Sequence, residues 1–199
     1  MDFFSIKEFK RPVTKKKAAY LYNLCHFPDE ALATEYVRTH TSVPVPKVLD
    51  VVQLPAGSVH TSRSFCASEH QVQRVCEHLR DWITQLRNLQ SPSDQRVCGF
   101  TGGSSRSLRI GEGPNKSYNI HFVHGDLLLH NILADSDLRP TGIIDWECAA
   151  WMPDYWETVS SSRGHYAYMW RWKDIRRETF TRYEAEVELD RAVQISRGE

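Results

Sequence analysis

The sequence predicts an α+β fold with a reduced N-terminal part, residues 1–60, and a larger, mainly helical C-terminal part, residues 61–199. Two patterns carry this prediction. Apolar residues recur at helical spacing along residues 72–86, and two short apolar runs at 131–134 and 141–145 enclose a turn, as in a β-hairpin. A chain of 199 residues is long enough for one sizeable core or two small lobes.

The N-terminal part is predicted to contain a strand over residues 18–24, a helix, and a second strand over 48–54. Pro28 suits the first turn of the helix, and the two acids that follow it favour the positive end of the helix dipole. The segment 41–46 ends the helix. Apolar residues recur at helical spacing within the predicted helix: Leu32, Ala33, Tyr36 and Val37.

The best-defined helix follows Ser68. Ser68 and Gln71 stand three residues apart, which is the spacing of a capping box. We assign the apolar stripe of this helix to the core rather than to a cofactor groove. Its members are Val72, Val75, Cys76, Leu79, Trp82, Ile83 and Leu86. Residues 99–119, rich in Gly, Ser and Arg, predict a surface loop.

Aromatic residues gather after residue 150. They are Trp151, Tyr155, Trp156, Tyr166, Trp170 and Trp172. Such a cluster usually packs a helical subdomain, and the alternative is a wall on which a ligand stacks. Residues 174–193 predict one terminal helix with Phe180, Tyr183 and Val187 facing inward.

The residues that suggest a chemical function lie in the segment 120–147. Residues 120–123 predict a short buried strand, and the sharp turn after it needs the freedom of Gly125. Asp126 and Asn131 lie five residues apart, and Asp145 ends the return strand of the hairpin. The hairpin is therefore expected to bring Asn131 and Asp145 together, with Asp126 one loop away.

Phosphoryl transfer from ATP needs these three groups. One carboxylate orients and deprotonates the attacking hydroxyl, and an amide and a second carboxylate hold Mg²⁺ through oxygen atoms. The protein kinase catalytic loop has the same order, an H-R-D-x-x-x-x-N motif followed by D-F-G, with Trp146 here in the place of the aromatic residue. The alternative is that the aspartates are ordinary turn residues. His121 and His124 could instead be metal ligands, but buried or loop-bracing roles are favoured.

These residues resemble the aminoglycoside phosphotransferase and choline kinase-like family, especially its fungal members. Two segments, FVHGDLLLHNILAD and TGIIDWECAAWMPDYWE, resemble the catalytic loop and metal motif of that family. EALATEYVRTHTSVPVPKVLDV resembles its small-lobe helix and following strand, and HLRDWITQLRNLQSP resembles its first large-lobe helix.

The resemblance implies a two-lobed, protein kinase-like fold with ATP between the lobes and transfer of the γ-phosphoryl group to a hydroxyl of a small molecule. By this resemblance Asp126 is the catalytic base and His124 buttresses its loop. Asn131 and Asp145 bind Mg²⁺. Glu30 takes the place of the glutamate that pairs with the phosphate-binding lysine.

The small lobe departs from the family pattern. No glycine precedes Gly57, so a Gly-rich phosphate loop is absent. Lys17 is the candidate for the phosphate-binding lysine, although it precedes the predicted strand, and Tyr22 or Asn23 stands about where that lysine is expected. Three interpretations follow: a divergent small-molecule kinase, a pseudokinase that binds a ligand or partner without catalysis, or a truncated relative. We favour the phosphotransferase.

Composition limits the partners. Lys plus Arg equals Asp plus Glu, 25 of each, so no nucleic-acid or membrane partner is indicated. The apolar runs are too short to span a bilayer, the start lacks the pattern of a secretion signal, and five cysteines without a C-x-x-C pair suggest reduced thiols. We therefore expect a cytoplasmic protein. Acids after the metal motif could form a wall for a cationic substrate such as an aminoglycoside or an amine, although structural roles are favoured: Glu147, Asp154 and Glu157.

Overall fold

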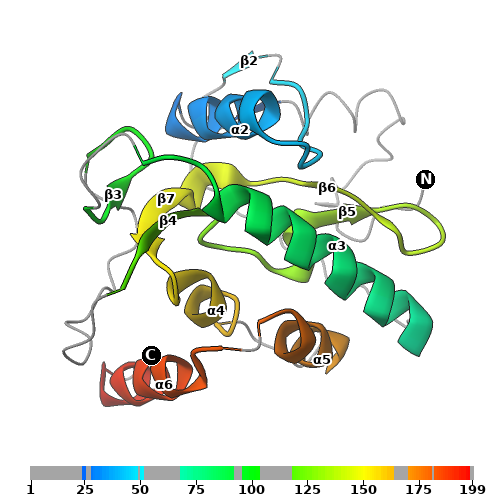
Figure 1. Ribbon diagram of the computed structural model, residues 1–199, viewed down its shortest axis with the longest axis vertical. Coiled ribbons are helices and arrows are strands. Elements are labelled where there is room, and N and C mark those ends of the chain that lie inside the picture. The colour runs from blue at the N-terminus through cyan, green and yellow to red at the C-terminus, as the bar shows by residue number, and fades with distance from the viewer. Residues whose placement is uncertain are drawn as a thin grey trace, which may run out of the picture.

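The computed structural model describes residues 24–25, 28–48, 50–51, 68–91, 96–103, 118–163, 170–180 and 182–197. Most of the two predicted N-terminal strands, most of the predicted 99–119 loop, Lys17 and Tyr166 lie outside these ranges. The helices and small sheets of the described part form an α+β arrangement, as predicted (Figure 1).

A small antiparallel sheet forms the centre of the described part. Strand β7 (Ala150–Pro153) lies between β3 (Cys98–Gly99) and β4 (Ile120–Val123). Val123 pairs with Ala150, so the loop that follows β4 begins beside the segment that leads into β7. The strand predicted at 120–123 is thus confirmed, and its pairing brings two distant chain segments to one end of the sheet.

The predicted hairpin is also confirmed. Strands β5 (Ile132–Ala134) and β6 (Pro140–Ile143) pair antiparallel, with Ile132 opposite Ile143. Asp135 closes the turn, because its Oδ1 accepts the backbone N–H groups of Asp137 and Arg139. Asn131 lies just before β5 in the 3₁₀ turn η1 (Leu129–Asn131) rather than within the strand.

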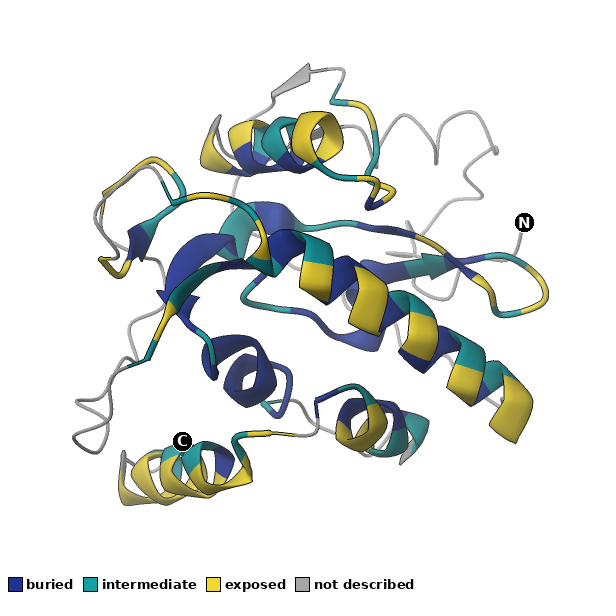
Figure 2. Cartoon of the chain, viewed as in Figure 1, coloured by how far each residue is buried: buried dark blue, intermediate teal, exposed yellow. Residues whose placement is uncertain are grey.

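Helix α3 (Glu69–Arg87) confirms the predicted stripe. Ser68 caps it in a capping box with Gln71, and all seven predicted core residues are buried. Figure 2 shows this buried edge running along α3, opposite an exposed one. The helix packs against β4 and α5 (Trp170–Thr179), so it supports the strand that leads into the candidate site.

Helix α2 (Pro28–His40) starts at the predicted proline and packs against the 3₁₀ turn η2 (Trp146–Cys148). Its buried stripe is Glu30, Ala33, Thr34 and Val37, the i, i+3, i+4, i+7 set of one helix face. Leu32 falls outside that set and is 52% exposed, so its predicted place in the stripe is wrong. Strands β1 (Leu24–Cys25) and β2 (Asp50–Val51) precede and follow this helix in the chain and pair with each other in parallel.

The C-terminal region differs from the single predicted helix. Helix α4 (Trp156–Ser160) precedes α5, and α5 and α6 (Glu184–Arg197) are separate helices. The helical conformation is interrupted before α6 at Tyr183, whose φ is 72°. No Pro or Gly lies between residues 174 and 193, so no local signal marks this break. Phe180 and Val187 are nevertheless buried, as predicted.

The aromatic cluster packs the interior. Trp151, Trp156 and Trp172 are each at most 2% exposed, which favours the core interpretation over a ligand wall. Arg163 lies over the Trp156 ring and pairs with Asp190, which ties α6 to α4. None of the described helices is both long and apolar enough to cross a bilayer.

Candidate functional site

The loop after β4 brings Asp126 and Asn131 into direct contact. The Asn131 amide Nδ2 donates to the backbone oxygen of Asp126 at 2.8 Å and to its Oδ2 at 3.1 Å. Both partners are acceptors only, which fixes the orientation of the amide. Its nitrogen faces Asp126, and its Oδ1 accepts no hydrogen bond from the residues that the structure describes. Asn131 is buried, whereas the Asp126 side chain is 40% exposed and can meet a substrate.

Asp145 reaches the same place through the hairpin. The backbone N–H of Ile144 donates to the carbonyl oxygen of Asn131 at 3.0 Å, so Asp145 follows a residue bonded directly to Asn131. Asp145 itself has left-handed backbone angles, φ 69° and ψ 61°. This conformation is unfavourable for a side chain other than Gly by about 1 to 2 kcal/mol, and such residues concentrate at functional sites.

His124 joins the two halves of the site. It is fully buried, its Nδ1 accepts the backbone N–H of Asp126 at 3.2 Å, and its Nε2 lies 3.0 Å from the carbonyl oxygen of Ile144. These partners assign the ring proton to Nε2, which donates to Ile144. The Trp146 ring meets the His124 ring edge-on at 4.7 Å. The described contacts thus give His124 a bracing position, and His121 likewise bonds the backbone, at Arg87.

Glu157 has a structural role in this site, which the sequence favoured for it, although its contacts with the loop after β4 were not predicted. From α4 its carboxylate accepts the backbone N–H of His124 at 2.7 Å and that of Gly125 at 3.2 Å. Burial raises the pKa of Glu157 above the usual 4.5, although the two backbone N–H groups favour its charged form. At 2% exposure it cannot belong to an acidic substrate wall, and that hypothesis is wrong for this residue.

Comparison with known protein families places the chain. The sequence model of the phosphotransferase enzyme family matches residues 69–193, which is more than half of the chain. The chain belongs to this family. The predicted family resemblance is therefore confirmed, and the family implies a protein kinase-like fold for this chain.

A curated relative supports the same assignment. The chain is similar to a protein of Arabidopsis thaliana described as probable choline kinase 3, with 24% identity over 104 residues. The match covers 52% of this chain but only 30% of the relative. The chain thus spans about a third of the length of that protein.

Two further residues were predicted for the site, Glu30 and Lys17, and their outcomes differ. Glu30 lies in the first turn of α2 and is 8% exposed, on the helix face that packs toward η2 and hence toward the segment after Asp145. Lys17 lies outside the described residues, so the predicted pairing of a lysine with Glu30 stays a prediction.

Gly125 is needed for the turn between His124 and Asp126. Its φ is 81°, and a Cβ there would lie 2.4 Å from the carbonyl oxygen of Cys148. Because this neighbour is backbone, Gly125→Ala should force the loop away from η2 and lower the free energy of unfolding by about 2 to 3 kcal/mol. Urea unfolding would measure this. Gly103→Ala is the matched control, since a Cβ at Gly103 meets nothing within 4 Å. Equal stabilities of the two variants would contradict the expectation.

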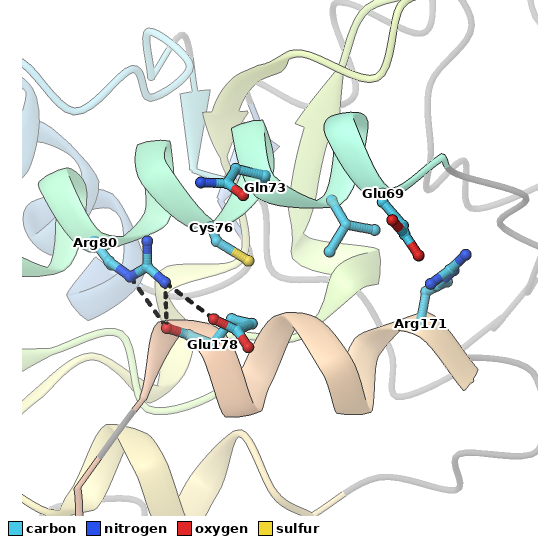
Figure 3. A pocket seen from close by; sticks show the side chains of 7 residues that line it. Glu69, Gln73, Cys76, Arg80, Arg171 and Glu178 are labelled. Atoms are coloured by element: carbon cyan, nitrogen blue, oxygen red, sulfur yellow. Dashed lines mark hydrogen bonds and ion pairs between the residues drawn. The ribbon is translucent and has the colours of Figure 1, made fainter.

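A shallow hollow of about 230 Å³ lies away from this site, between α3 and α5 (Figure 3). Arg80 spans its edge and donates to the backbone oxygen of Glu178. The Cys76 thiol faces this hollow and donates to the carbonyl oxygen of Ile175, and burial raises its pKa. A buried thiol of this kind is unreactive, so we assign the hollow to helix packing.

Proposed function

We propose that this chain transfers the γ-phosphoryl group of ATP to a hydroxyl of a small molecule. One observation supports this most: Asn131 bonds the side chain of Asp126 and, through its backbone, the residue before Asp145. Asp126, whose side chain is open to substrate, therefore contacts the Asn131 amide, and Asp145 follows the residue that bonds the backbone of Asn131. Family membership supports the reaction class.

In the proposed reaction, the acceptor oxygen forms a bond to the γ-phosphorus while the bond from that phosphorus to the bridging oxygen of ADP breaks. Asp126 orients the hydroxyl and takes its proton, and ADP leaves with the electrons of the broken bond. The 40% exposure of the Asp126 side chain suits this role, and its contact with Asn131 holds it in place.

The donors fit Mg²⁺, which prefers oxygen ligands and keeps several waters or phosphate oxygens. The Oδ1 of Asn131 and the carboxylate of Asp145 would hold it in this proposal. When bound, the ion would neutralise charge on the phosphate groups. Asp145 is held in position by its left-handed backbone and by the buried Trp146 that follows it.

We further propose that the nucleotide lies between a small lobe, residues 1–60, and a large lobe, residues 61–199. Helix α2 would belong to the small lobe, and its packing against η2 supports this arrangement. Glu30 and Lys17 would contribute to the nucleotide site. The acceptor class is tested most directly with choline, named for the relative, and with an aminoglycoside as a second cationic alcohol.

Mg·ATP is expected to stabilise the chain. At one hundred times its dissociation constant, a ligand that binds only the folded state adds about 2.7 kcal/mol, which thermal unfolding would show as a rise in melting temperature. Asp145→Asn is the matched variant, because Asn tolerates left-handed backbone angles but removes the charge. It should lose the Mg²⁺-dependent part of the rise. No rise in the wild-type chain would contradict the proposal and favour a binding module without nucleotide.

A further inference from the structure

His130 lies beside Asp126 and has no role in the reaction described so far. It belongs to the 3₁₀ turn η1, and its Nε2 lies 3.8 Å from Oδ2 of Asp126. The neighbours Leu128 and Leu129 are buried, but the His130 side chain is 32% exposed, on the same open side as the Asp126 carboxylate. The ring therefore lies within reach of the carboxylate that the proposed reaction uses.

The two oxygens of the Asp126 carboxylate have different surroundings. Oδ2 accepts the Asn131 amide at 3.1 Å and faces His130, whereas Oδ1 accepts no hydrogen bond from the described part of the chain. A carboxylate held through one oxygen presents the other to its substrate. The distance of 3.8 Å is too long for a hydrogen bond, but catalytic hydrogen bonds in unliganded enzymes are often long and shorten when substrate binds.

We infer that His130 is a positioning residue: its Nε2–H and the Asn131 amide together hold Oδ2 of Asp126, so that Oδ1 receives the proton of the acceptor hydroxyl. This inference rests on the proposed phosphotransfer. The proton passes from the hydroxyl to Oδ1 as the new oxygen–phosphorus bond forms, and His130 keeps its own proton throughout. A small error in the position of a catalytic group can lower the rate by about 100-fold, so a residue that acts only through Asp126 can still be important.

Side chains of matched reach test the inference. The amide nitrogen of Gln extends as far as Nε2 of histidine, whereas that of Asn corresponds to Nδ1. His130→Ala and His130→Asn should lower kcat by about 10- to 100-fold, and His130→Gln should lose less than about 5-fold. The KM for ATP and the melting temperature should stay close to the wild-type values. Mg²⁺-dependent ATP hydrolysis, with water as the acceptor, gives kcat without a known substrate.

Chemical rescue separates positioning from a structural role. Free imidazole should restore part of the activity of His130→Ala, because the site of the ring is open to solvent. His70→Ala, on the exposed face of α3, is the control and should be unaffected. Unchanged kcat in His130→Ala, or a loss accompanied by a lower melting temperature without rescue, would overturn the inference alone. An inactive wild-type chain would overturn the proposed function and this inference with it.

Discussion

Asp126→Asn is expected to lower Mg²⁺-dependent phosphoryl transfer by about 100- to 10,000-fold, the usual contribution of a general base. The amide cannot take the hydroxyl proton. Its oxygen can still accept the Asn131 amide, so the loop should keep its conformation and the melting temperature should change little. The measurement is kcat for ATP consumption with choline, an aminoglycoside or water as acceptor, followed together with thermal unfolding.

The control for this variant is Asp137→Asn. Asp137 is an exposed aspartate in the turn between β5 and β6, in the same hairpin but on the solvent side. Its substitution should leave kcat within about two-fold of the wild-type value, since surface changes usually have small effects. If Asp126→Asn retained full turnover, Asp126 could not be the base and the proposed reaction would need another carboxylate.

Local signals predicted the elements that carry the candidate site. The hairpin could be predicted because apolar runs and the Asp135 turn lie within fifteen residues of each other. The helix after Ser68 was predictable because its capping box and its apolar stripe agree. In both cases a short stretch contains the whole signal, so the contact of Asn131 with the segment before Asp145 followed from the sequence.

Contacts between distant segments could not be predicted in the same way. Glu157 binds the backbone of residues more than thirty positions earlier, and only the pairing of β4 with β7 brings them together. The break at Tyr183 depends on packing too, because helical periodicity continues through it. Leu32 was misassigned since the periodicity of α2 admits two adjacent faces, and the position of η2 decides between them.

Removing the Glu157 carboxylate should cost more stability than any other single change proposed for this site. Glu157→Leu would leave the N–H groups of His124 and Gly125 buried without an acceptor. At about 1 to 3 kcal/mol for each group, the expected loss is about 2 to 6 kcal/mol. Urea unfolding measures the loss. Activity should fall as well, because the same N–H groups fix the backbone just before Asp126. A variant as stable as the wild-type chain would show that these hydrogen bonds add nothing to the free energy of unfolding.

The pH dependence of stability tests the charge state of this carboxylate. Burial raises the pKa of Glu157 above 4.5, so the folded chain binds more protons at this residue than the unfolded chain. Its contribution to the free energy of unfolding is therefore full below pH 4.5 and is lost as the pH rises through the raised pKa. Glu157→Gln keeps one acceptor oxygen and cannot ionise, so its stability should fall less over that range. Parallel pH profiles for the two chains would mean that Glu157 ionises as easily in the folded chain as in water, and the hydrogen bonds from His124 and Gly125 would then offset the effect of its burial on the pKa.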